Sequence, residues 1–227
     1  MTKIIAGKIN ITEPDGKTSP YERFIVTINP DGSRTLRTVT RSPKGDLLRD
    51  VNQLLDSQWR DVQALGRVFF KGEALGTVLR RVVGDVLYST VLSPDGTKDE
   101  ASFEAPVQMI LGFHAILADS WKMNRVDTSH QEFQEIMVHT VSDTWNGSSL
   151  GHGKRLVSKA RFDKAEQLTL PAGTFACEKF VWLTSFGKEL HVWRTGEANV
   201  LAKMLVVSGD KKGSIYELTD YEEETVG

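Results

Sequence analysis

Cysteine and long apolar runs are both scarce in this chain. Cys177 is the only cysteine among 227 residues, which excludes an internal disulfide framework and a metal site built from several cysteines, and is compatible with a reducing compartment. No stretch approaches the roughly 18 uninterrupted apolar residues of a membrane span, and the apolar run near the N-terminus is too short for a signal peptide. These absences predict a cytoplasmic protein that has no membrane partner.

An excess of positive charge and the common cofactor motifs are absent too. Lys and Arg number 28 against 30 Asp and Glu, so the formal net charge is -2, whereas a nucleic-acid partner needs a clustered basic surface. The sequence contains no glycine-rich dinucleotide loop, no Walker loop and no His-Glu-x-x-His motif. We therefore expect no nucleic-acid partner, no metal and no cofactor.

Turn signals divide most of the chain into short segments. The tripeptide Pro-Asp-Gly occurs at 14–16, 30–32 and 94–96, and these three residue types favour the backbone angles of a tight turn. Short segments between such turns are typical of a sandwich or barrel. The predicted strands lie at about 3–12, 21–29, 33–42, 65–71, 74–82, 85–93, 98–104, 132–144, 154–169, 174–185, 188–195, 198–208 and 213–223.

Residues 46–59 allow two interpretations. Apolar residues between Leu47 and Leu55 fall at helical spacing after Asp46, which could cap a helix. The same residues lie between predicted strands and could form two bent strands with Trp59 at the corner. The pattern alone leaves helix and strand open.

Residues 106–122 form a longer apolar run that is entered through a proline. Its apolar residues, together with His114, make one stripe of a helix, which predicts one principal helix at about 107–121. The strand at 198–208 is apolar on both faces, so we expect both faces to be covered. The sequence therefore predicts a single domain of residues 1–227, an all-β, mainly antiparallel sheet that curves into a barrel or half-barrel around that helix and encloses an apolar cavity.

Three polar residues in apolar stripes are candidate catalytic residues: His114, Asp119 and Lys203. His114 is either a core histidine with a backbone partner or an acid or base that faces the cavity. Asp119 follows five residues later, about 140° around an ideal helix, so the two share a site only if the segment bends. Lys203 either pairs with a carboxylate or points inward and stabilises negative charge on a substrate.

Aromatic and basic side chains supply candidate ligand contacts. Trp182, His191 and Trp193 lie on strands whose aromatic faces could stack on a flat apolar ligand, although aromatic pairs across strands are more often plain packing. His139 leaves the same choice open, and Arg49 is either a surface charge or a clamp for a ligand carboxylate or phenolate. Trp121 ends the helical stripe. The candidate substrate-binding residues are therefore Trp121, Arg49, His139, Trp182, His191 and Trp193.

Several short segments carry a resemblance. They are Phe113–Trp121, Leu48–Val51, Pro171–Phe175, the strand that contains Trp193, and Tyr216–Leu218. In these segments the chain resembles a loosely defined group of uncharacterised bacterial β-rich proteins similar to the lipocalin-like and β-clam superfamilies. The resemblance implies a strongly curved antiparallel sheet around a helix or ligand and a strand at 48–55. It singles out His114, Asp119 and Trp121, and it brings no known reaction.

Three functions are compatible with these patterns. The leading hypothesis is a cofactor-independent acid/base enzyme, a lyase, dehydratase or isomerase, that acts on an apolar and aromatic small molecule through His114, Asp119 and Lys203 or Arg49. The alternative is a non-catalytic protein that binds a hydrophobic ligand in the same cavity. The third is a structural or partner-binding module with a filled core. A homodimer is compatible with each of them.

Overall fold

The computed structural model describes residues 1–142 and 149–227, which form one 15-stranded sheet and two short helical segments. The strands of the first half are β1 (Thr2–Thr12), β2 (Thr18–Ile28), β3 (Arg34–Arg41), β4 (Leu47–Leu55), β5 (Asp61–Phe70), β6 (Glu73–Val83), β7 (Val86–Leu92) and β8 (Lys98–Glu104). Those of the second half are β9 (Ile110–Gly112), β10 (Gln134–Thr140), β11 (Lys154–Leu170), β12 (Gly173–Leu183), β13 (Glu189–Thr195), β14 (Val200–Val206) and β15 (Ile215–Val226). The helical segments are α1 (Ala118–Trp121) and the 3-10 turn η1 (Lys122–Arg125).

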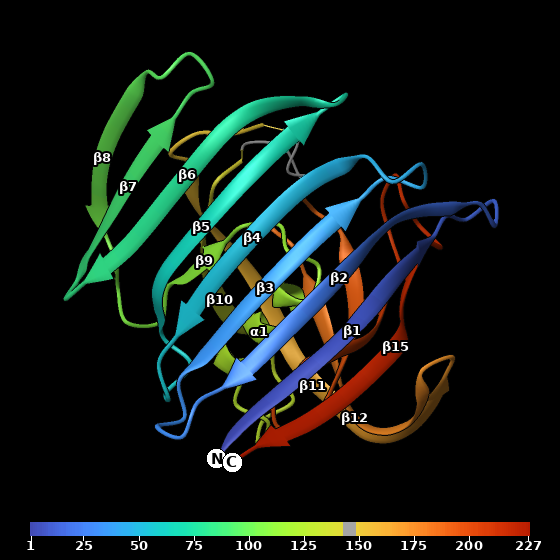
Figure 1. Ribbon diagram of the computed structural model, residues 1–227. Coiled ribbons are helices and arrows are strands. Elements are labelled where there is room, and N and C mark those ends of the chain that lie inside the picture. The colour runs from blue at the N-terminus through green and yellow to red at the C-terminus, as the bar shows by residue number, and fades with distance from the viewer. Residues whose placement is uncertain (143–148) are drawn as a thin grey trace.

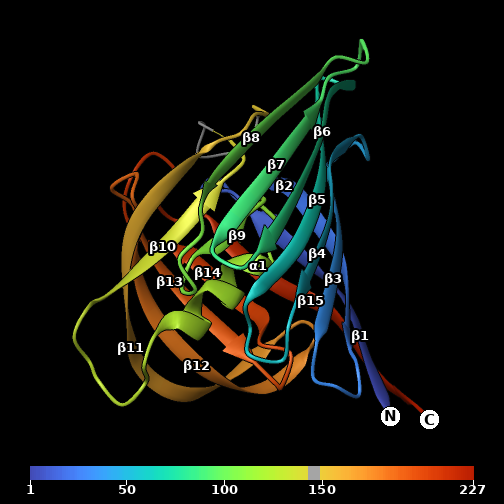
Figure 2. The ribbon, with the colours of Figure 1, turned by 90° about the vertical axis from the view of Figure 1, so that its left-hand side faces the viewer.

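The sheet consists of two meanders that meet at β1 and β15. Its strand order is β8-β7-β6-β5-β4-β3-β2-β1-β15-β14-β13-β12-β11-β10-β9, and β9 pairs with β10 in parallel while the other pairs are antiparallel. The two halves curve toward each other, and α1 lies in the space between them (Figures 1 and 2). This architecture confirms the predicted all-β, barrel-like curved sheet, which is open between its edge strands β8 and β9.

The Pro-Asp-Gly turns join strands as the sequence predicts. Gly16, Gly32 and Gly96 have φ values of 78°, 80° and 87°, a region that glycine enters without steric cost. In each turn the aspartate accepts a hydrogen bond from the backbone N–H two residues later, as Asp31 Oδ1 does from Ser33 at 2.8 Å. These turns connect β1 to β2, β2 to β3 and β7 to β8.

Residues 47–55 are a strand, so the helical alternative for 46–59 is wrong. Val51, Gln53 and Leu55 are buried at 1%, 1% and 3% exposure, which is the alternation of a strand with one face on the core. The backbone of β4 pairs with β3 and β5 on its two sides. Leu55 shares the face of Val51, whereas Leu54 lies half-buried on the other face, and sheet pairing decides between the two patterns.

The predicted helix at about 107–121 is wrong over most of its length. Val107 is 68% exposed, and Ile110–Gly112 is the edge strand β9. His114 has φ of 55°, which interrupts a right-handed helix. The amides of Ile116 and Leu117 donate to the carboxylate of Glu22, at 2.9 and 2.8 Å, instead of to preceding carbonyls. Only α1 is an α-helix.

Side chains bridge the opening of the sheet near β9 and β10. Asp61 Oδ2 on β5 accepts the amide of Leu111 at 3.0 Å, and Gln53 Nε2 donates to Asp61 Oδ1 at 2.5 Å. The guanidinium of Arg80 on β6 donates to the carbonyls of His139 and Thr140, both at 2.8 Å. The two halves of the sheet are thus joined at β1–β15 by backbone pairing and at this side-chain seam by polar contacts.

Candidate functional site

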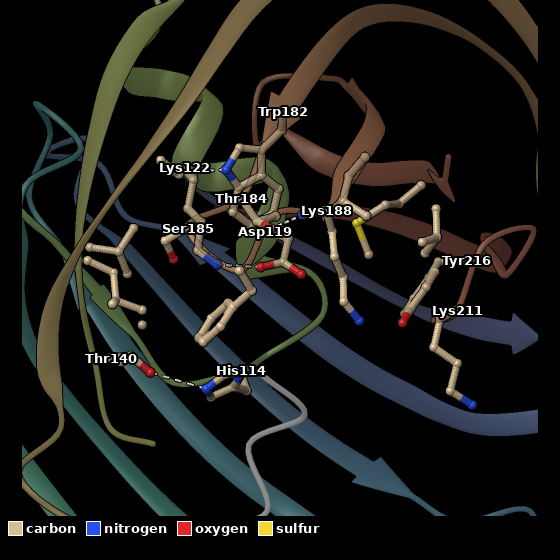
Figure 3. A pocket seen from close by; sticks show the side chains of 18 residues that line it. His114, Asp119, Lys122, Thr140, Trp182, Thr184, Ser185, Lys188, Lys211 and Tyr216 are labelled. Carbon is tan, nitrogen blue, oxygen red and sulfur yellow. Dashed lines mark hydrogen bonds and ion pairs between the residues drawn. The ribbon is translucent and has the colours of Figure 1, made fainter. Parts of the chain in front are cut away.

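Two adjoining cavities lie on the concave side of the sheet. One has a volume of about 150 Å³ and the other about 430 Å³. Four residues line both of them: His114, Asp119, Lys211 and Tyr216. Figure 3 shows His114, Asp119 and Tyr216 around one space. The first two belong to the segment 113–121, called the inner segment below, and Tyr216 belongs to β15. These shared residues define the candidate site.

The smaller cavity is mostly apolar. An engineered cavity of about this volume in another protein admits benzene, so one six-membered ring fits here. Its apolar lining comes from β10 to β14, because their inward residues alternate with outward ones. These apolar residues are Val138, Leu156, Trp182, Leu190, Met204 and Val206.

His114 is held in place by Thr140 and is uncharged. Its Nε2 lies 3.1 Å from the Thr140 hydroxyl, which also lies 3.1 Å from the carbonyl of Ser142. The amide of Ser142 donates to the same hydroxyl at 3.2 Å. All these groups are satisfied when His114 donates from Nε2 and Thr140 donates to Ser142, which leaves Nδ1 of His114 as an acceptor. Burial, with the charges of Arg49 and Lys122, lowers the pKa of His114 to about 3.

Asp119 and Lys122 form an ion pair at the cavity wall. Lys122 Nζ lies 2.5 Å from Asp119 Oδ1, and their side chains are only 12% and 20% exposed. The same ammonium lies 4.7 Å from the centre of the Trp182 ring, which adds a cation–π attraction. Because the segment bends at His114, both His114 and Asp119 face the cavities, as a straight helix could not arrange.

Arg49 approaches the larger cavity from β4. Burial lowers the pKa of its guanidinium, and the charge of Glu22 opposes that effect. Glu22 is completely buried beneath the inner segment and accepts the Thr40 hydroxyl at 2.9 Å in addition to the two amides of that segment. Burial raises the pKa of Glu22, while these three donors and Arg49 favour its ionised form.

Three further residues of the site, Lys188, Lys211 and Tyr216, were not predicted from the sequence patterns. Lys211 binds Glu13 at 2.9 Å, Lys188 forms an ion pair with Asp210, and all three of Lys188, Lys211 and Tyr216 line the smaller cavity. Burial raises the pKa of Tyr216 to about 12. Lys188 and Lys211 stand beside turns and look like solvent charges in sequence, and Tyr216 was noted only within the resemblance. No periodic signal in the sequence separates these three residues from other residues of the turns and strands.

The candidate residues of the sequence divide into two groups. The cavities bring together His114, Asp119, Arg49 and Trp182. Lys203 pairs with Glu217 at 3.0 Å, because Met204 and Val206 take the inward positions of β14.

The other four lie outside the cavity walls. On β13, Leu190 takes the position that faces the cavity. His191 instead lies 3.1 Å from Glu189, and the indole of Trp193 donates to Glu166 at 2.8 Å. His139 packs on Phe103, and Trp121 donates to the Ala198 carbonyl.

Within residues 1–142 and 149–227, no three or more His, Cys, Asp or Glu side chains lie close enough together to hold a metal ion. Across the same ranges no helix is long and apolar enough to cross a bilayer.

Comparisons with known proteins show a shared fold and no shared family. No protein-family model matches the chain, and no curated protein matches it. A β-barrel-like protein of a domain of unknown function (DUF1849) from Brucella abortus is similar over 99% of this chain and 98% of its own, with TM-score 0.59 and 10% identity. A DUF1089 family protein from Pseudomonas aeruginosa covers 82% of this chain and 88% of its own, with TM-score 0.47 and 11% identity. A candidate lipoprotein from Parabacteroides distasonis covers 96% and 94%, with TM-score 0.46 and 13% identity. The first of these likenesses shows that the chain shares the fold of a β-barrel-like protein of unknown function.

Proposed function

We propose that the protein binds a small, partly apolar molecule in the two adjoining cavities. The observation that carries this proposal is the cavity of about 150 Å³ whose mostly apolar lining opens onto the polar group of His114, Asp119, Lys211 and Tyr216. An apolar recess with a few convergent polar groups is the usual form of a small-molecule site. A flat ring held beside Trp182 satisfies the apolar lining.

Binding fits the chemistry of the site better than acid/base catalysis does. A histidine with a pKa near 3 is a weak base, and at neutral pH it is not the imidazolium that a general acid requires. Asp119 is engaged by Lys122. Neutral His114 instead offers its Nδ1 as a hydrogen-bond acceptor for a ligand N–H or O–H group.

The cofactor-independent lyase, dehydratase or isomerase remains a second candidate because of one observation. His114 has φ of 55° at the cavity wall, and strained backbone at a cavity is common in active sites. Turnover of aromatic alcohols and diols, compared between the native protein and His114→Asn, decides between the two functions. Saturable binding without turnover excludes the enzyme.

A matched pair of substitutions tests where the ligand binds. Leu156 lines the smaller cavity, whereas its neighbour Val157 is 44% exposed on the opposite face of β11. Leu156→Phe places extra volume in the cavity, and we expect it to weaken binding of aromatic probes by about tenfold, or about 1.4 kcal/mol. Val157→Phe should bind as the native protein does, in calorimetric titrations of both.

Two outcomes contradict the proposed site. If no ring-containing or short-chain probe binds the native protein at millimolar concentration, the binding function is wrong. If Leu156→Phe and Val157→Phe weaken binding equally, the ligand lies elsewhere.

A further inference from the structure

We propose that the ligand of this site is a carboxylate with a single negative charge, carried on a small ring or short chain. The carboxylate lies beside Lys211, Lys188 and Tyr216, and the apolar part lies against Trp182. This inference rests on the proposed binding function and names its ligand class.

The walls of the two cavities carry more positive than negative charge. Their cationic residues are Arg49, Lys122, Lys188 and Lys211, and their carboxylates are Glu13 and Asp119. Four positive and two negative groups leave a surplus of two positive charges, in a chain whose formal net charge is -2. His114 adds no charge near neutral pH. The local field therefore favours an anion, in contrast to the chain as a whole.

Tyr216 supplies a hydrogen-bond donor that is still available. Its hydroxyl has no hydrogen-bond partner within the described ranges 1–142 and 149–227, yet the side chain lines both cavities. Burial keeps this phenol protonated, since its pKa rises to about 12. Figure 3 shows Tyr216, Lys188 and Lys211 on the same side of the pocket. An O–H donor on the same side of the cavity as two ammonium groups suits one carboxylate.

The existing ion pairs limit the charge of the ligand. Lys211 is paired with Glu13, Lys122 with Asp119, and Lys188 with Asp210. Because each of these lysines already has a carboxylate neighbour, little positive charge is left to compensate the second charge of a phosphate dianion. When Asp210, the partner of Lys188, is counted with the wall groups, four positive and three negative charges leave a surplus of one, which a monoanion matches.

The apolar part of the ligand extends into the smaller cavity. Lys188 lines the smaller cavity together with Trp182, Leu190 and Met204. A carboxylate at Tyr216 directs an attached ring toward these side chains, where burial of its apolar surface contributes to affinity. The neutral face of His114 borders the same space.

The test compares each carboxylate with its neutral amide of the same shape. The probes are benzoate, 4-tert-butylbenzoate and octanoate, each against the corresponding amide, and benzyl phosphate, in calorimetric titrations at pH 7 with the native protein. We expect at least one carboxylate to bind about tenfold or more tightly than its amide, because hydrogen bonds to a charged acceptor are roughly twice as strong as those between neutral groups.

Three variants locate the carboxylate. Tyr216→Phe removes only the hydroxyl and Lys211→Met removes one ammonium, so each should reduce the carboxylate preference about fivefold or more. Lys203→Met is the matched control, because Lys203 is also a partly buried, paired lysine but lies outside both cavities. It should keep the native preference.

The outcomes separate this inference from the binding function. If an amide binds as tightly as its carboxylate, or benzyl phosphate binds more tightly than benzoate, the carboxylate assignment is overturned while the binding function stands. If Tyr216→Phe and Lys211→Met both behave as Lys203→Met does, the carboxylate lies elsewhere. If no probe binds, both proposals fail together.

Discussion

His114 shows how one residue sets the shape of the site. Its positive φ turns the inner segment away from β9 and toward α1, so that His114 and Asp119 both reach the cavities. Thr140 then fixes the imidazole. The sequence could predict this histidine as a candidate because a polar residue interrupts an apolar run. It could not predict Lys188, Lys211 and Tyr216, because Lys188 directly precedes β13 while the other two come from the turn before β15 and the start of β15, and only the folded sheet brings them to one cavity.

The burial of His114 predicts a pH dependence of stability. Its pKa falls from an ordinary 6.5 to about 3, so between these pH values the unfolded chain binds a proton that the folded protein does not. Stability from this group therefore rises with pH across that window. His114→Asn keeps a residue that tolerates positive φ but removes the proton site. Between pH 4 and 6.5, we expect the unfolding free energy of the native protein to rise by about 1 to 3 kcal/mol more than that of the variant.

Chemical unfolding of both proteins at several pH values measures this difference. Other groups, such as Asp61 with its pKa raised to about 6 by burial, contribute to both profiles and cancel in the comparison. Parallel profiles would show that His114 titrates alike in the folded and unfolded chains.

At the scale of elements, the inner segment is held by polar groups in place of helix formation. Glu22 on β2 takes two of its amides, and the Ser120 hydroxyl donates to the Leu117 and Asn199 carbonyls at 2.7 and 2.6 Å. The helical periodicity of 107–121 failed as a predictor because apolar residues there face both halves of the sheet. Strand alternation succeeded elsewhere because most strands, such as β3 and β5, bury one face and leave the other more exposed.

Glu22→Gln tests this anchoring. The amide group of glutamine can replace only one acceptor oxygen and places an NH₂ against a backbone donor, so we expect a loss of about 2 to 4 kcal/mol in the free energy of unfolding. Urea unfolding measures it. Glu73→Gln, an exposed change on β6, should stay within about 0.5 kcal/mol of the native protein. Equal stabilities would mean that the carboxylate is dispensable to the segment.

For the whole molecule, the side-chain seam joins the two halves of the sheet across its opening, where a closed barrel would use strand pairing. Arg80 is completely buried, and besides its bonds to β10 it donates to the His152 carbonyl at 2.5 Å. Burial lowers the pKa of this guanidinium to about 9. The curved sheet could be predicted from turns, alternation and resemblance. Its seam could not, because Arg80 sits in the sequence beside Arg81, an exposed residue of the same type.

That pair of arginines provides a test of the seam. Arg80→Met leaves three backbone carbonyls without their donor and should destabilise the protein by about 3 to 5 kcal/mol, with faster amide hydrogen exchange in β9 and β10. Arg81 points outward, so Arg81→Met should leave the free energy of unfolding and the exchange rates in β9 and β10 close to native. If exchange in β9 and β10 is unchanged in Arg80→Met, the seam does not depend on this side chain.

The pairing of β1 with β15 has a consequence for how the protein is made. Thr2 is aligned with Val226, so the strands that join the two meanders are separated by nearly the whole chain. Each meander is built from neighbouring hairpins that can form early, whereas the β1–β15 junction requires closure of a very long loop, which is slow and entropically costly. Tyr216 belongs to that last strand. The binding cavity therefore cannot be complete until β15 has been synthesised and has paired with β1.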